Sequence, residues 1–125
     1  MLLNARTGHV VADRVELADT RQTRRRGLLG RQSIAAASAL ILRPCFAVHT
    51  ISMKFAIDVV FVNRDGVVVK IARNLNPWRM TAAWTAHAAI ELGVGGAGGV
   101  EVGDRLYLAA ERAPVGAAVS WPLPA

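Results

Sequence analysis

The sequence predicts a mainly β domain, a compact antiparallel β-sandwich or barrel-like fold with one short helix. About six short segments carry β-branched or alternating apolar residues, and only one segment shows a helical pattern. Many short strands separated by turn residues are typical of sandwiches and barrels. The 125-residue chain is about as long as one domain, and its 53% hydrophobic residues can bury a core without disulfides.

The first expected elements are one strand and the helix. Residues 10–17 interleave β-branched residues with charges, as in a half-buried strand. Asp19 or Thr20 can cap a short helix, because both side chains accept amide hydrogens of a first turn. This helix is expected to end within residues 27–30, where glycines provide a natural stop.

A hairpin and several further strands are expected along the rest of the chain. Residues 57–62 and 67–72 flank an Asp-Gly turn at residues 63–66, which is a strong hairpin signal. The other strand candidates are residues 39–42, 86–92 and 105–109. The glycine-rich residues 93–99 are interpreted as a turn rather than a phosphate-binding loop, because no Walker lysine follows them. We expect one domain over residues 1–125, with a core at about 10–110 and a loosely held, proline-containing tail at 111–125.

The chain is basic, with a formal net charge of +6, which suggests nucleic acid or acidic lipid as partners. The dense arginine cluster is confined to residues 21–31, however, and its helical spacing is typical of a solvated face. A basic nucleic-acid-binding protein is therefore kept only as an alternative.

The apolar runs are too short for a membrane span, which needs roughly 20 apolar residues. No secretion-signal pattern is present either, so we expect a cytoplasmic location. The single cysteine, Cys45, agrees with this expectation because it allows no internal disulfide.

Residues 45–58 concentrate side chains that can carry chemistry. Cys45, His49 and Met53 are spaced by four and would suit a soft metal ion. In extended chain, however, Cys45 and Met53 would lie roughly 26 Å apart, and Cys45 and His49 roughly 13 Å apart. We therefore expect no metal and no cofactor. A metal-dependent enzyme, or a hydrolase-type enzyme with Cys45 as nucleophile, His49 as base and Asp58 as orienter, remains an alternative, with Cys45 as a possible reactive thiol.

Asp58 and Glu91 each interrupt an apolar segment, where an unpaired carboxylate is costly. Each must face solvent, find a partner or accept backbone hydrogen bonds. A carboxylate that pins a loop and a carboxylate that contacts a ligand both remain open for these positions.

Several motifs, taken together and in order, resemble the bacterial and archaeal family known as domain of unknown function 192, DUF192. They are R-x-x-G-L-L-G-R (24–31), A-L-I-L-R-P-C (39–45), V-H-T-I-S-M-K-F-A-I-D-V-V-F-V-N (48–63), D-G-V-V-V (65–69), L-N-P-W-R (75–79), A-I-E-L-G (89–93) and G-D-R-L (103–106). The resemblance covers roughly residues 10–110 and implies a compact antiparallel β-sandwich-like fold without an established activity. The chain departs from the family at Ser52 and Ala56, where relatives usually have Gly and Pro.

We expect a non-enzymatic domain that binds a small ligand or a partner protein. The pocket residues that we predict are His49, Thr50, Met53, Asp58, Glu91 and Arg79. A few polar groups in an apolar setting are the usual composition of a ligand pocket, and the loop at residues 77–79 could close it. The alternative is structural: the same motif satisfies buried backbone groups and only determines the fold.

Overall fold

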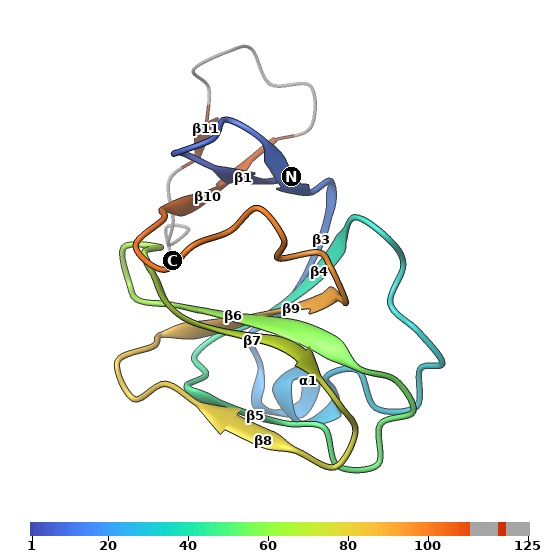
Figure 1. The fold of residues 1–125 in the computed structure, drawn as a ribbon. Coiled ribbons are helices and arrows are strands. Elements are labelled where there is room, and N and C mark those ends of the chain that lie inside the picture. Colours follow the sequence, from blue (N-terminus) through green and yellow to red (C-terminus); the bar gives the residue numbers. More distant parts are fainter. Residues whose placement is uncertain (111–117, 120–125) are drawn as a thin grey trace.

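The computed structural model describes residues 1–110 and 118–119, which form three sheets and one short helix (Figure 1). The mainly β class is confirmed, and no closed barrel forms among the described residues. Within that part of the chain, no helix has the length and apolar character needed to cross a membrane.

The central sheet has five strands in the order β3-β4-β9-β6-β7. Their bounds are Arg14–Ala18 (β3), Ser38–Leu42 (β4), Ala88–Gly93 (β9), Ile57–Val62 (β6) and Val68–Leu75 (β7). Strand β6 is buried at every position, Asp58 included, as expected for a central strand that is otherwise apolar. All pairs are antiparallel except β3 and β4, which run parallel because α1 and a long loop connect them.

A second sheet has the order β11-β10-β1-β2. Its strands are Ala118–Val119 (β11), Leu106–Ala109 (β10), Leu2–Asn4 (β1) and Val10–Ala12 (β2). The single strand expected over residues 10–17 is divided at Asp13 into β2 and β3, which belong to different sheets. Leu2 and Leu106 from this sheet share a core with Val60 and Ile90 of the central sheet. Apart from β11, the expected tail at residues 111–125 lies outside the described residues.

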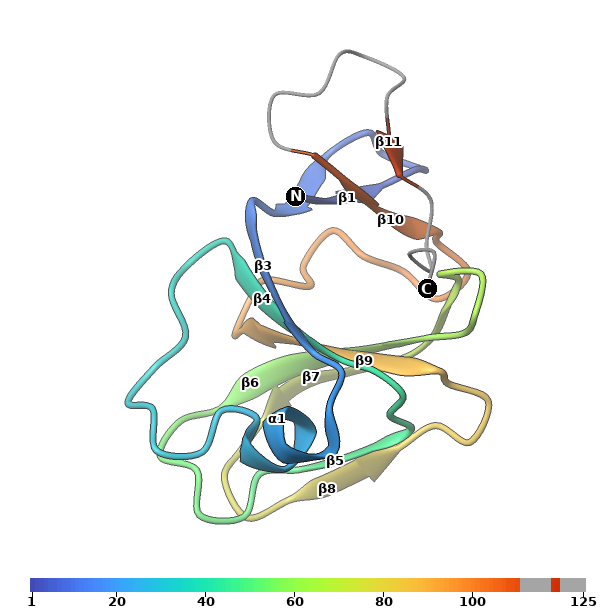
Figure 2. The same ribbon diagram turned by 180° about the vertical axis from the view of Figure 1, so that it is seen from behind.

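A two-stranded ribbon forms the third sheet, with β5 at Ala47–His49 paired to β8 at Met80–Ala82. The helix α1, Arg21–Arg26, lies between this ribbon and the central sheet in both views (Figures 1 and 2). A second core fills the space around it with Leu28, Leu42, Val48 and Met53, which pack together with Phe61 of β6.

The helix begins at the predicted cap, Thr20. The Thr20 hydroxyl accepts from the backbone N–H of Thr23, whose own side chain accepts from the Thr20 N–H. Gly27 ends the helix with a φ of 46°, in the left-handed region that glycine adopts without strain. The helix buries none of its own residues, so its cap and its neighbours hold it in place.

Candidate functional site

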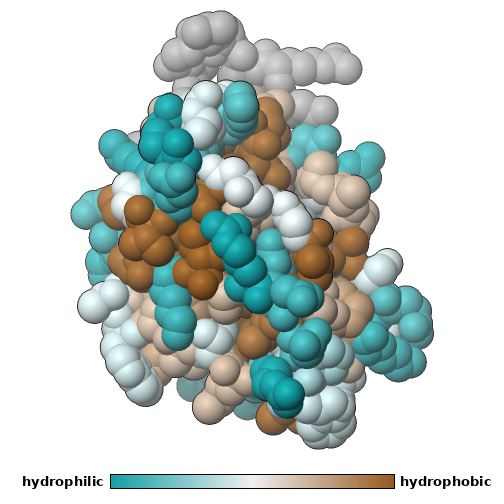
Figure 3. Space-filling view, viewed as in Figure 1, coloured by the Kyte–Doolittle hydropathy of each residue, from teal (hydrophilic) through white to brown (hydrophobic). Residues whose placement is uncertain are grey.

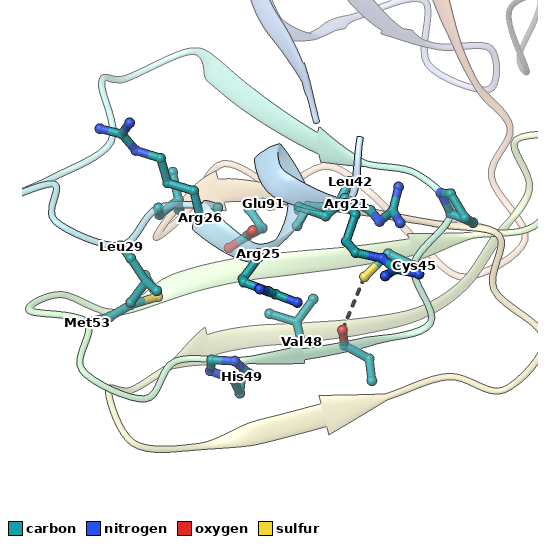
Figure 4. Close-up of a pocket in the computed structure, with 15 residues that line it drawn as sticks. Arg21, Arg25, Arg26, Leu29, Leu42, Cys45, Val48, His49, Met53 and Glu91 are labelled. Atoms are coloured by element: carbon teal, nitrogen blue, oxygen red, sulfur yellow. Dashed lines mark hydrogen bonds between the residues drawn. The ribbon is translucent and has the colours of Figure 1, made fainter. Parts of the chain in front are cut away.

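A cavity of about 340 Å³ lies between α1, β5 and the central sheet. Its basic wall comes from α1 and its apolar wall from the second core, and Cys45, β5 and β9 contribute the remaining polar groups (Figure 4). The lining residues that carry functional groups are Arg21, Arg24, Arg25, Arg26, Cys45, His49 and Glu91, and the large apolar ones are Leu28, Leu29, Leu42, Val48 and Met53.

Among the described residues, Glu91 is the only carboxylate that lines this cavity. It lies on β9 between Leu40 of β4 and Val59 of β6, and its side chain faces the end of α1, where a Cβ on Gly27 would lie 3.7 Å from Oε1. Only 3% of the residue is exposed, and no described residue forms a hydrogen bond or ion pair with its carboxylate. Burial raises the pKa of Glu91 to about 7, partly offset by the positive charge of Arg31. Near neutral pH this carboxyl group can therefore either donate or accept a hydrogen bond.

The arginines of α1 form the basic wall of the cavity. Arg24 donates to the backbone carbonyls of Asp19 and Arg43. Arg25 extends from the helix toward β5, whereas Arg26 points away from the centre of the cavity (Figure 4). The side chains of Arg21, Arg25 and Arg26 form no hydrogen bond or ion pair with any described residue. The solvent-facing arginines expected from the sequence are thus also the rim of a cavity.

Cys45 lies in the cavity wall and donates a hydrogen bond from Sγ to the carbonyl of Ala47 at 3.1 Å. Burial raises the pKa of the Cys45 thiol, and the nearby Glu91 raises it further. A nucleophilic cysteine needs the opposite shift, toward the thiolate. This environment is therefore that of a packed thiol.

His49 and Met53 line the same cavity as Cys45, although extended chain would have separated them widely. The chain turns back after β5, where Met53 N–H donates to the carbonyl of Thr50 and Ser52 adopts a φ of 65°. Ser52 therefore occupies the left-handed region that favours glycine, the residue that relatives usually have there. Within the described residues, no three His, Cys, Asp or Glu side chains are grouped as metal ligands would be.

Asp58 lies away from this cavity and binds backbone groups. Its Oδ1 accepts from the N–H of Asn74, and its Oδ2 accepts from the N–H groups of Gly95 and Ala97. It thereby fixes the glycine-rich turn after β9 to the end of β7. Arg73 also holds this turn, because its guanidinium donates to the carbonyls of Ala97 and Val100.

Thr50 and Arg79 form a second clasp outside the cavity. The buried Thr50 hydroxyl donates to the carbonyl of Asn76 at 2.6 Å and accepts from the N–H of Arg79 at 2.9 Å. Backbone bonds from Thr50 to Arg79 and from Trp78 to Thr50 complete the connection. The loop at residues 77–79, which we expected to close a pocket, is tied to the end of β5 and does not line the cavity.

Asp104, in the G-D-R-L motif, forms a third buried polar cluster. It accepts from Arg6 Nε at 2.6 Å, from Asn4 Nδ2 at 2.8 Å and from the N–H of Glu101 at 2.8 Å. Arg6 is the main reason that the pKa of Asp104 lies well below its usual range. The cluster ties β1 to the turn before β10.

Of the predicted pocket residues, His49, Met53 and Glu91 share the cavity, as does Cys45, whereas Thr50, Asp58 and Arg79 hold loops. The arginines of α1 and Leu29 were missing from the prediction. The R-x-x-G-L-L-G-R motif was the available signal, because it places arginine beside leucine and glycine at the end of a helix.

Comparisons with known proteins agree with this fold. A model of the DUF192 family, described as "Uncharacterized ACR", matches residues 2–108. A crystal structure of a protein of unknown function from Novosphingobium aromaticivorans DSM 12444 is 28% identical with a TM-score of 0.66, over 74% of this chain and 72% of that chain. A "putative transcription regulator" from Sinorhizobium meliloti 1021 is 25% identical with a TM-score of 0.68, over 74% of this chain and 78% of that chain. No curated protein matches the chain.

Proposed function

The chain belongs to the DUF192 family, and we propose that it is a non-enzymatic domain that binds a small molecule in the cavity between α1 and β5. The ligand carries an acidic group at one end and an amine or another N–H donor at the other. One observation carries this proposal: the carboxylate of Glu91 is buried in the cavity wall with no hydrogen-bond partner among the described residues. The cytoplasmic location expected from the sequence remains a prediction.

The amine end of the ligand is inferred from Glu91. A buried carboxylate without a partner is costly, and its raised pKa reflects that cost. A ligand ammonium group beside Glu91 would supply both the missing charge and the missing donors. Binding of such a group should therefore lower the pKa of Glu91 and release a proton near neutral pH.

The acidic end is inferred from the rim of the cavity. Arg21 and Arg25 are four residues apart on α1 and thus lie on one face of it. A guanidinium group binds a carboxylate or phosphate through paired hydrogen bonds. Between this rim and Glu91, Leu42 and Val48 provide apolar contacts for the body of the ligand.

Four probes of equal chain length separate these contributions: hexanoate, hexylamine, 6-aminohexanoate and hexanol. Measured by isothermal titration at neutral pH, 6-aminohexanoate should bind most tightly. Glu91→Gln should remove the advantage of its amine, and Arg25→Gln the advantage of its acid. Arg64→Gln, on the exposed turn between β6 and β7, is the matched control. Equal binding of all four probes, or equal effects of the three substitutions, would show that the cavity does not select this ligand class.

Nucleic-acid binding is a second candidate, because one similar structure is named as a transcription regulator and α1 is rich in arginine. It predicts retardation of DNA or RNA that falls steeply as salt is added. A variant in which Arg21, Arg25 and Arg26 are replaced by glutamine should lose this binding. Glu91→Gln should leave it unchanged, so the two candidates are separable.

A further inference from the structure

The largest exposed apolar side chains of the described residues are concentrated on the ribbon and its adjoining loops. Trp84 is 81% exposed, Met80 72% and Trp78 63%, and Phe46 and Ile51 are nearly half exposed. Elsewhere the exposed large apolar residues are scattered aliphatic side chains, namely Val10, Leu17, Val94 and Val102. Pale and brown residues lie beside teal ones along the lower edge of the molecule, where Figure 1 places β5 and β8 (Figure 3).

The backbone holds these side chains outward in fixed positions. Val48 of β5 is buried toward the second core, which leaves His49 and its cross-strand partner Met80 exposed. Trp78 has a φ of 64°, an uncommon conformation for a bulky residue, and its N–H is bonded to the carbonyl of Thr50. A strained and anchored backbone that presents a tryptophan to solvent is the kind of feature found at functional surfaces.

The charge of this region is uniformly positive. Neither residues 43–57 nor residues 66–90 contain any aspartate or glutamate. Lys54, Lys70 and Arg79 are exposed there, and Lys70 donates from Nζ to the carbonyl of Ala82 in β8, which places it at the ribbon. The surface therefore combines protruding apolar groups with cations and has no fixed negative charge of its own.

We propose that the outer face of the β5–β8 ribbon, formed by Phe46, Ile51, Trp78, Met80 and Trp84, binds the surface of an anionic lipid bilayer. Tryptophan is favoured at the boundary between headgroups and acyl chains, and adjacent cations attract anionic headgroups. This surface is independent of the cavity, because none of its five apolar residues lines it.

Two features favour lipid over a nucleic acid on this face. Met80 and Ile51 protrude as aliphatic side chains, which insert among acyl chains but offer no flat face for a base. The rings of Phe46 and Trp84 already contact each other, with centroids 5.1 Å apart and planes tilted by 38°. Stacked recognition of bases would need these faces to be free.

Sedimentation with vesicles tests the proposal, using phosphatidylcholine alone and phosphatidylcholine mixed with phosphatidylserine, at low and high salt. We expect binding to the mixed vesicles at low salt, with a blue shift of tryptophan fluorescence, and little binding to phosphatidylcholine. A Trp78→Ser/Met80→Ser/Trp84→Ser variant should bind the mixed vesicles at least about tenfold more weakly, because these side chains supply the apolar area that is buried on binding. A Val94→Ser/Val102→Ser variant, altered at exposed positions outside the ribbon, is the matched control.

Circular dichroism should show that both variants are folded, so that a loss of binding can be assigned to the surface. The proposal is overturned if the wild type does not sediment with the mixed vesicles at low salt. It is equally overturned if the triple variant binds as well as the control. Binding of oligo(dT) that the triple substitution removes, with vesicle binding unchanged, would instead identify a nucleic-acid surface.

Discussion

Replacement of Asp58 by asparagine should destabilise the protein strongly without altering the cavity. The carboxylate is 2% exposed and accepts three backbone N–H bonds, from Asn74, Gly95 and Ala97. Asparagine keeps only one accepting oxygen. In the more favourable orientation of the side-chain amide, that oxygen still accepts from the N–H groups of Gly95 and Ala97. The NH₂ group then faces the N–H of Asn74, which loses its acceptor.

The cost of this change can be worked out from those three bonds. One buried donor left without an acceptor costs about 1–3 kcal/mol, and loss of the charge weakens the other two bonds by about 0.5–1 kcal/mol each. The free energy of unfolding should therefore fall by about 2–5 kcal/mol. For a chain of this length the melting temperature should fall by roughly 8–19 °C.

Urea unfolding followed by tryptophan fluorescence measures this change, with Asp65→Asn as the control. Asp65 lies exposed on the turn between β6 and β7, and its carboxylate accepts no hydrogen bond from any described residue. The control should change the stability by less than about 0.5 kcal/mol. If Asp58→Asn is as mild as Asp65→Asn, the three hydrogen bonds do not hold the glycine-rich turn, and the structural role assigned to Asp58 is wrong.

Urea unfolding of variants at three further buried positions, Glu91, Thr50 and Asp104, tests other polar groups of the interior. Because the pKa of Glu91 is raised from 4.5 to about 7, the stability of the wild type should fall as the pH rises from 4.5 to 7. Glu91→Gln should be more stable than the wild type by up to about 3 kcal/mol above pH 7 and by little below pH 4.5. The control Glu16→Gln, at an exposed position, should show no such gain. Thr50→Val should lose about 2–4 kcal/mol of stability, because one buried carbonyl and one buried N–H lose their hydrogen-bond partner. Thr50→Ser keeps the hydroxyl and should lose under about 1 kcal/mol. Equal losses in the two variants would show that the hydroxyl does not hold the loop. Because the pKa of Asp104 is lowered in the native state, its contribution to the free energy of unfolding should be complete above pH 3.8, the ordinary pKa of aspartate, and lost as the pH falls below it. Parallel loss of stability by the wild type and Asp104→Asn on acidification would contradict this.

The strands that follow a marked pattern could be predicted from the sequence. Strand β6 has the predicted bounds because its apolar run ends at an Asp-Gly turn, which leaves little freedom in register. Strand β1 is only three residues long, Leu2–Asn4, and so shows no period to detect. The alternation of residues 10–17 continues across Asp13, although the chain passes there from one sheet to another. Which sheet a strand joins depends on distant contacts that a local pattern does not contain.

The cavity could be predicted only in part. The cost of burying a carboxylate singled out Asp58 and Glu91 together, and the structure gives them different surroundings. We expected Cys45 to lie far from Met53 because we assumed extended chain, and nothing in the sequence marks the turn between them. Serine at position 52 hides a left-handed backbone that a glycine would have signalled.

These differences divide the buried polar groups into two kinds. Asp58 and Thr50 bind backbone groups of loops, so the fold itself accounts for them. The carboxylate of Glu91 forms no hydrogen bond in the described part of the chain, and above pH 7 its charge destabilises the native state. The two kinds should therefore respond in opposite ways: Asp58→Asn should lose stability and keep the binding of 6-aminohexanoate while folded, whereas Glu91→Gln should gain stability and lose that binding. A buried carboxylate that costs stability and supports no loop is the group whose presence a ligand best explains.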